Sequence, residues 1–327
     1  MTTADYLKEF NDEVFKKYKA LTIGEVGGSP TTDQALKYSN YKTGSMSMVF
    51  NFDTCWENGA YGSVDKSDEE IVTNLRNMKA IFLKWYNNNY EYADMPIYWT
   101  NHDHPRCLSQ YGSTKYRKES GKMLITTLLF MYGLPFILYG DEIGMSNVDY
   151  DNISDFKDVE DINFQKACPD IPKDKLLRYF RRCSRTNGRM PFNWSNEKYA
   201  GFSKVEPYIK NVNYYPICNE HDESKDPDSI LNYYKLAFNL RHNNDILSSI
   251  LNNRFELLEP ENDSVFAYTH LGEKNPLIVI SNFTSKEINF KKYFKNYEIL
   301  LHNYPSISEN EENYFLRPFE TFLLKIR

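Results

Sequence analysis

The sequence has few cysteines and few histidines, which limits the covalent and metal chemistry that it can support. It contains five cysteines and six histidines in 327 residues. The cysteines are widely separated and never in C-x-x-C spacing: Cys55, Cys107, Cys168, Cys183 and Cys218. This pattern excludes a disulfide framework or a zinc ribbon, and it is typical of reduced thiols in a cytoplasmic protein.

A long apolar segment and a basic stripe are also missing. The longest apolar run, residues 123–140, is interrupted by Gly133 and Pro135, so we expect no membrane span. Residues 1–19 lack the apolar core of a signal peptide, which again predicts a cytoplasmic protein. The formal net charge of −6, without clustered lysines and arginines, argues against nucleic acid as a partner.

The first 145 residues contain short β-like runs that alternate with helical periodicity. We predict helices over 4–19, 67–88 (with Ser67 as N-cap) and 117–132, and strands over 20–26, 47–52, 96–102 and 136–143. Such alternation predicts βα units and a parallel sheet. Four units make half of an eight-stranded (β/α)8 TIM barrel, so the fold class is α/β with a partial barrel.

The remaining sequence predicts two further regions. Residues 146–226 are polar and without clear periodicity, which we interpret as a long region of binding loops. A helix is expected over 227–242, and from about residue 250 short alternating runs predict an antiparallel β-sandwich. The predicted organisation is a partial catalytic barrel over 1–245 and a C-terminal β-sandwich domain over 246–327.

Each predicted barrel strand ends in acids, amides or a histidine. The residues are Glu25, then Asn51 and Asp53, then His102 and Asp103, then Asp141 and Glu142. In (β/α) barrels the loops that follow the strands converge on one face, where the chemistry is carried out. We therefore expect a functional site at this end of the strands.

The stretch Y-W-T-N-H-D-H-P-R, residues 98–106, admits a metal site or an acid–base site. If it continues the strand, His102 and His104 point the same way, but no third ligand has metal spacing, so we expect no metal and no cofactor. A carboxylate pair is better supported. Glu25 sits among glycines in a tight setting that raises a carboxyl's pKa and favours a proton donor, while Arg106 favours ionised Asp103. Two such carboxyls suit glycosidic cleavage.

Several long blocks occur in the order found in the α-amylase superfamily (glycoside hydrolase family 13). The chain resembles in particular its oligo-1,6-glucosidases, α-glucosidases and trehalose-6-phosphate hydrolases, and the resemblance covers essentially all of it. The blocks are LTIGEVGG (21–28), SMSMVFNF (45–52), IYWTNHDHPR (97–106), FILYGDEIGM (136–145), NISDFKDVEDIN (152–163) and GRMPFNW (188–194).

The resemblance implies a role for each of four residues. Glu25 resembles the general acid/base, and Asp103 resembles the acid that binds the glycone hydroxyls and stabilises the transition state. His102 and Arg189 resemble substrate-binding residues, and the implied substrate is a short oligosaccharide. The sequence departs from the usual pattern beside these residues, at Thr100, His104, Tyr139 and Thr186, which bears on linkage or chain-length preference rather than on reaction class.

The resemblance also implies that this chain begins after the segment that carries the nucleophilic aspartate. We therefore expect a C-terminal fragment of a retaining α-glucosidase acting on α-1,6 bonds, inactive alone. Three alternatives stay open: a fragment of a trehalose-6-phosphate hydrolase, a catalytically dead carbohydrate-binding or scaffold protein, and one half of a split enzyme whose partner chain carries the N-terminal half-barrel.

Overall fold

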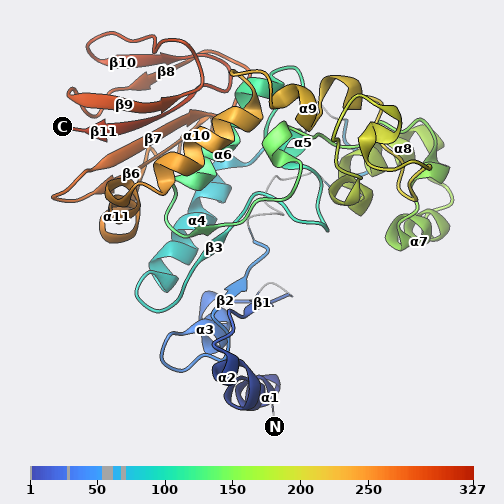
Figure 1. Ribbon diagram of the computed structural model, residues 1–327, viewed down its shortest axis with the longest axis horizontal. Helices are drawn as coiled ribbons and strands as arrows, with labels where there is room; N and C mark the ends of the chain where they lie inside the picture. Colours follow the sequence, from blue (N-terminus) through green and yellow to red (C-terminus); the bar gives the residue numbers. More distant parts are fainter. Residues whose placement is uncertain (1, 28–29, 54–61, 68–70) are drawn as a thin grey trace.

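The computed structural model describes residues 2–27, 30–53, 62–67 and 71–327. Its N-terminal portion contains two pairs of parallel strands with intervening helices (Figure 1). The elements are α1 (Thr3–Phe10), the π-helix η1 (Asn11–Phe15), α2 (Lys16–Tyr18), β1 (Ile23–Glu25), α3 (Thr32–Ser39), β2 (Met48–Phe50), α4 (Leu75–Asn89), β3 (Pro96–Ile97), α5 (Cys107–Tyr111), α6 (Arg117–Leu129) and β4 (Leu134–Pro135).

The four strands follow one another as in a barrel wall. β1 pairs with β2 and β3 pairs with β4, both in parallel. Side chains join the two pairs, because the ring of Phe50 packs edge-on against Tyr98 and Phe136, with centroids 5.1 and 4.7 Å apart. The partial parallel barrel predicted from the sequence is confirmed.

Local signals explain where these helices begin. α1 has a capping box in which Thr2 and Asp5 satisfy each other's backbone N–H groups, and α3 has the same device in Thr31 and Gln34. The predicted start of the next helix at Ser67 is wrong. α4 begins at Leu75, and the Asn74 side chain accepts from the N–H of Asn77, so the asparagine replaces Ser67 as the cap. Residues 68–70 lie outside the described part.

The predicted strand 96–102 is too long, and the strand predicted over 136–143 is misplaced, because β4 covers only Leu134–Pro135. β3 ends at Ile97 because residues 101–104 form a turn, as described below. β4 ends at Pro135, and residues 141–143 form the 3-10 helix η3 (Asp141–Ile143), entered through Gly140 at φ +92°. Glycine adopts that backbone conformation at little cost, so the chain can leave the strand direction there.

The region 146–226 is more ordered than its polar sequence predicts. It contains 3-10 turns and three helices around a core of its own, which includes Val148, Phe156, Leu176 and Phe180. The elements are η4 (Ile153–Asp155), α7 (Val159–Ala167), α8 (Lys173–Cys183), η5 (Arg185–Arg189), η6 (Lys198–Gly201), η7 (Tyr215–Ile217) and α9 (Glu220–Glu223). The interpretation as loops without regular structure is therefore wrong.

Two helices and two antiparallel sheets complete the chain. The five-stranded sheet has the order β5-β6-β7-β11-β9, and β10 pairs with β8 in a second sheet. The elements are α10 (Ile230–Arg241), α11 (Asn244–Asn252), β5 (Arg254–Leu258), β6 (Val265–Leu271), β7 (Leu277–Asn282), β8 (Ile288–Lys291), β9 (Tyr297–His302), β10 (Asn313–Leu316) and β11 (Thr321–Ile326). The predicted C-terminal antiparallel domain is present, while the boundary between residues 245 and 246 stays a prediction.

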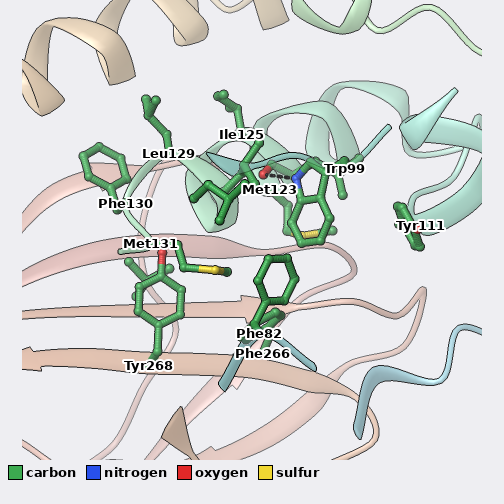
Figure 2. Packing of buried hydrophobic residues seen from close by; sticks show 14 of the residues in the cluster. Phe82, Trp99, Tyr111, Met123, Ile125, Leu129, Phe130, Met131, Phe266 and Tyr268 are labelled. Carbon is green, nitrogen blue, oxygen red and sulfur yellow. Dashed lines mark hydrogen bonds between the residues drawn. The ribbon is translucent and has the colours of Figure 1, made fainter. Parts of the chain in front are cut away.

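The central strands β6 and β7 are buried on both faces, so they lack the strict alternation that a sheet with one exposed face would show. On β6, Phe266 and Tyr268 face α4 and α6, whereas Val265 and Ala267 face the two-stranded sheet. Figure 2 shows the first face, where Phe82 and other barrel residues pack against the sheet. The barrel helices and the sheet therefore share one hydrophobic core.

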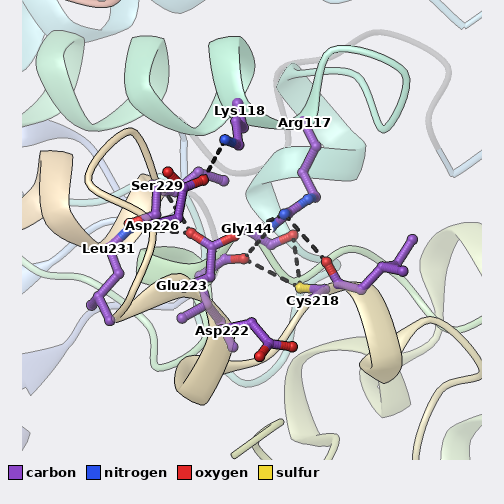
Figure 3. A network of polar contacts seen from close by, with 12 residues as sticks. Arg117, Lys118, Gly144, Cys218, Asp222, Glu223, Asp226, Ser229 and Leu231 are labelled. Atoms are coloured by element: carbon purple, nitrogen blue, oxygen red, sulfur yellow. Dashed lines mark hydrogen bonds and ion pairs between the residues drawn. The ribbon is translucent and has the colours of Figure 1, made fainter. Parts of the chain in front are cut away.

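A polar network fixes the segment that follows β4. Arg117, at the start of α6, forms an ion pair with Glu223 at 2.8 Å and donates to the carbonyl of Ile143 at 2.7 Å (Figure 3). The second oxygen of Glu223 accepts the N–H of Ile230 at 2.9 Å, which is the first residue of α10. One carboxylate thus connects α6, α9 and α10 beside η3.

Candidate active site

Residues 101–104 form a tight turn, and this turn sets the direction of both histidines. The Asn101 side chain accepts the N–H of Asp103 at 2.8 Å, and its carbonyl accepts the N–H of His104 at 3.1 Å. His102 is therefore exposed while His104 is buried. The expectation that both histidines point the same way is wrong, because an asparagine side chain competes with the strand ladder here.

Asp103 lies among three groups that can carry positive charge. Its Oδ1 accepts a hydrogen bond from Nη2 of Arg189 and lies 3.7 Å from Nη1 of Arg185. Its Oδ2 lies 3.5 Å from Nε2 of His102. The structure thus brings three of the predicted site residues together, and the half-exposed carboxylate can still accept hydrogen bonds from a ligand.

Asp158, the N-cap of α7, holds the two arginines in place. Arg189 donates Nη1 to its Oδ2 at 2.9 Å, and Arg185 donates Nη2 to its Oδ1 at 2.8 Å. Burial of Asp158 opposes ionisation, but the hydrogen bonds from Arg185 and from the N–H of Glu160, together with the two positive charges, hold the pKa of this carboxyl below its usual value. Asp158 therefore stays charged and orients Arg189 toward Asp103.

A glycine and a tyrosine let the Arg189 segment approach the turn. A Cβ on Gly188 would lie 2.8 Å from the carbonyl oxygen of His104 and 2.9 Å from that of Asn101, so no other residue fits without a backbone shift. The Tyr139 hydroxyl donates to the carbonyl of Met190 at 2.7 Å. Nε of Arg189 then reaches the carbonyl of His102 at 3.0 Å.

Arg106 does not have the role that its position in the sequence predicts. Its side chain is fully buried, donates Nε to the carbonyl of Asn187 at 2.9 Å and also donates to the carbonyl of Tyr139. Within the described residues no ion pair joins Arg106 to Asp103, so the predicted neighbour of the carboxylate is wrong. Arg189 and Arg185 supply the positive charge instead.

Asp141, which follows β4, is a buried carboxyl beside this site. Burial raises its pKa to about 7, an effect that the charge of Arg106 opposes and that Glu142 reinforces. The buried imidazole of His104 shows the complementary effect, because burial lowers its pKa to about 4. Both side chains are therefore mainly neutral under mildly acidic conditions, so the interior around the turn carries little charge besides Arg106.

Glu25 is the last residue of β1 and lies opposite Phe50 in the parallel register. Its side chain is exposed, so the tight, partly apolar setting predicted for it is not found. Across the described part of the chain, no hydrogen bond or ion pair joins Glu25 to His102, Asp103 or Arg189. Glu25 stands at the C-terminal end of β1 and Asp103 lies in the segment that follows β3, and the C-terminal ends of the strands are where (β/α) barrels carry their chemistry.

Among the described residues, no three or more His, Cys, Asp or Glu side chains are arranged to hold a metal ion. In the same part of the chain, no helix is long and apolar enough to cross a membrane.

The partial barrel and the Asp103 site indicate a class of protein, and comparison with known proteins identifies its family. Residues 2–249 match the family described as Alpha amylase, catalytic domain. The chain therefore belongs to the α-amylase family.

Individual relatives and solved structures show which members of this family the chain is similar to. Oligo-1,6-glucosidase from Bacillus cereus is 35% identical over 334 residues, which cover 98% of this chain and 58% of the relative. Trehalose-6-phosphate hydrolase from Bacillus subtilis (strain 168) is 28% identical, with 98% and 58% covered. The crystal structure of Bacillus licheniformis trehalose-6-phosphate hydrolase matches with a TM-score of 0.89 at 30% identity, covering 99% of this chain and 59% of that one. The chain thus spans just under three fifths of the length of these proteins.

Asp158 and Arg185 were not among the residues predicted for the site. A signal for each exists in the sequence. Asp158 stands immediately before an acidic first helical turn, as an N-cap does, and Arg185 and Arg189 are two arginines close together in the sequence at the start of the GRMPFNW block. Their convergence on Asp103 depends on the packing of α7 and could not be read from spacing.

Proposed function

We propose that this chain supplies the acid/base and the glycone-binding residues of a retaining α-glucosidase acting on α-1,6 bonds of short oligosaccharides. The observation that carries the proposal is the Asp103 carboxylate, which is held by Arg189 in the segment that follows the parallel strand β3, while Asp158 orients Arg189. Glu25 ends another parallel strand, β1. The similarity to oligo-1,6-glucosidases supports the linkage.

Each residue has a chemical part in the proposed reaction. Asp103 accepts hydrogen bonds from two sugar hydroxyls and stabilises positive charge that develops on the ring. His102, exposed beside it, binds a further hydroxyl. Arg189 fixes the carboxylate, and Glu25 gives its proton to the leaving oxygen and later removes one from water.

Retention needs a second carboxylate about 5–5.5 Å from the acid, to form the covalent glycosyl-enzyme. The described acids before Glu25, among them Asp5, Asp12 and Glu13, lie on the exposed surface of α1 and η1 and bind Thr2 or lysines. We infer that the nucleophile belongs to the part of the relatives that this chain does not cover, either on the same polypeptide or on a partner chain.

Exposed apolar side chains support such an association. Tyr6, Phe10, Tyr18 and Leu21 are at least half exposed on the first helix and just after it. Within the described strands, β1 pairs only with β2 and β4 only with β3, so each pair has an open edge. A preceding half-barrel would cover both features.

A second candidate is trehalose-6-phosphate hydrolysis, because a solved structure of such an enzyme matches with a TM-score of 0.89. A carbohydrate-binding protein without catalytic activity would use the same Asp103 site and is distinguished by the assay below. We infer a cytoplasmic location from the cysteines, because the described Cys107, Cys168 and Cys218 form no disulfide.

The test is complementation with a half-barrel that carries the nucleophile. The 327-residue chain is assayed on p-nitrophenyl α-glucoside, isomaltose and trehalose 6-phosphate, alone and after co-expression with the uncovered N-terminal part of the Bacillus cereus oligo-1,6-glucosidase. We expect hydrolysis of isomaltose only in the complex, and a loss of at least about 1,000-fold in E25Q.

The matched control is E13Q, which removes another exposed glutamate of the same N-terminal region and leaves the rate unchanged. Hydrolysis that persists in E25Q, or a folded complex that is inert on all three substrates, contradicts the proposal.

A further inference from the structure

Asp161 is a buried acid in the first turn of α7, and the proposed reaction does not use it. Its exposed fraction is 6%, whereas the neighbouring Glu160 and Ile162 are exposed. Moving a carboxylate out of water costs free energy unless hydrogen bonds or opposite charges compensate for the lost hydration. The groups that bind this carboxyl therefore indicate what it contributes to the protein.

The partner of Asp161 is Ser184, the residue that precedes η5. The buried Ser184 hydroxyl donates to Oδ2 of Asp161 and accepts the N–H of Thr186 at 3.0 Å. The carbonyl of Ser184 accepts the N–H of Asn187 at 3.1 Å. Because a hydroxyl has a single hydrogen, its bond to Asp161 fixes the direction in which the oxygen caps the turn. Asp161 thus holds the start of η5.

η5 carries the two arginines of the site. Arg185 forms ion pairs with Glu160 at 3.0 Å and with Asp158 at 2.8 Å, and Arg189 forms an ion pair with Asp158 at 2.9 Å. These pairs fix the guanidinium groups, whereas the bond from Asp161 fixes the backbone from which both side chains extend. The start of α7 therefore orients the arginines both at their tips and at their base.

The surroundings of Asp161 make its charge sensitive to pH. The charged and titratable groups around it come from the start of α7, from η5 and from α8: Asp158, Glu160, Arg185 and Tyr179. Burial raises the pKa of Asp161 to about 6, an effect that the two acids of α7 reinforce and that the Ser184 hydrogen bond and the charge of Arg185 oppose. A carboxylate accepts a stronger hydrogen bond than a neutral carboxyl, so ionised Asp161 holds Ser184 more firmly.

We propose that Asp161 is a positioning residue of the site, because its carboxylate fixes η5 through Ser184 and thereby holds Arg189 on Asp103. The proposal rests on the proposed function, since it assumes that Asp103 binds the glycone. It adds a residue that touches no substrate and yet sets the geometry of the substrate-binding carboxylate. Loss of the charge of Asp161 loosens the start of η5 and weakens the contact between Arg189 and Asp103.

Nuclear magnetic resonance of the arginine side chains in the 327-residue chain tests this coupling without any hydrolysis. Nε–H of Arg189 donates to the carbonyl of His102 at 3.0 Å, so its cross-peak reports the position of the side chain, and R189K identifies the peak. We expect a shift of this peak with a midpoint near pH 6 in wild type that D161N removes. A titration that stays unchanged in D161N belongs to another group, such as His102, and overturns the proposal.

Kinetics of the complex with the N-terminal half-barrel test the consequence for activity. We expect D161N and S184A each to lower kcat/KM for isomaltose about tenfold at about pH 8. The double variant D161N/S184A should be no worse than S184A, because both changes remove the same hydrogen bond. The advantage of wild type over D161N should shrink toward about pH 5, where protonated Asp161 resembles asparagine.

The matched control is D174N, which removes an exposed acid at the start of α8 and should leave the rate unchanged. Circular dichroism and thermal unfolding verify that each variant is folded. Equal rates of wild type and D161N at about pH 8, additive losses in the double variant, or the same loss in D174N would overturn the positioning role. An inert complex whose Arg189 cross-peak still follows the charge of Asp161 would reject the proposed function alone.

Discussion

Asp141 makes stability depend on pH at the scale of a single residue. Its pKa in the folded protein, about 7, is above the value of about 3.9 of an unfolded chain, so the native state binds the proton more tightly. Its contribution to stability is therefore fully present below about pH 4 and is lost as the pH rises through about 7.

Substitution D141N keeps the shape and removes the titration. We expect wild type to lose up to about 4 kcal/mol relative to the variant between pH 4 and pH 8, because one pKa unit corresponds to about 1.4 kcal/mol. Chemical denaturation of both proteins at pH 4.5, 6, 7 and 8.5 measures the difference. Curves that run parallel over this range would show that Asp141 titrates normally.

At the scale of single residues, some side chains of the site could be predicted from the sequence and others could not. Asp103, His102 and Arg189 were predicted and lie together. The turn that separates His102 from His104 depends on one asparagine side chain, and the pattern of a strand masks such a local competitor. Arg106 is adjacent to the site in sequence, yet packing turns it into the interior.

At the scale of elements, a buried lysine connects α4 to the five-stranded sheet through hydrogen bonds. Nζ of Lys79 donates to the carbonyls of Glu259, Asn262 and Val265 at 3.0, 2.7 and 3.2 Å, around the connection between β5 and β6. Burial lowers its pKa to about 8, which still leaves the side chain mainly protonated at neutral pH.

Substitution K79M removes this donor and leaves three carbonyls without it. We expect a loss of about 2–4 kcal/mol in the free energy of unfolding. The control is K84M on the same helix, whose half-exposed ammonium binds Asp53 and should cost less than about 1 kcal/mol. Equal losses in urea denaturation would show that the three carbonyls contribute nothing specific.

The elements that the sequence did not predict are those whose periodicity is masked by charge. α8 carries six charged residues among eleven, K-D-K-L-L-R-Y-F-R-R-C, and buries chiefly Leu176 and Phe180, four residues apart. In a polar context that spacing is easily overlooked, whereas the wide apolar faces of α4 and α6 and the largely apolar runs of β6 and β7 were clear.

At the scale of the whole molecule, the apolar surface of the N-terminal portion predicts self-association of the isolated chain. Phe10 and Tyr18 are 50% and 80% exposed, and Figure 1 shows the first helices at the end of the molecule remote from the C-terminal sheets. Exposed apolar area of this kind promotes association.

The double variant F10S/Y18S should lower the apparent mass in light scattering at a given concentration, by up to about half if the patch drives dimerisation. V205S/I217S changes two equally exposed apolar residues of the 146–226 region and should have no effect. An apparent mass that falls equally in both variants, or in neither, would assign the association to other surfaces.

The core shared by the barrel helices and the five-stranded sheet affects how much folded protein a cell contains. Tyr268 donates to the carbonyl of Thr127 at 2.7 Å across this core, so helices and sheet gain stability from the same contacts. A destabilising change in the sheet therefore raises the population of chains open to proteases, although it touches no ligand. Variation far from Asp103 would then alter activity in a cell through the number of surviving molecules, with the turnover of each survivor unchanged.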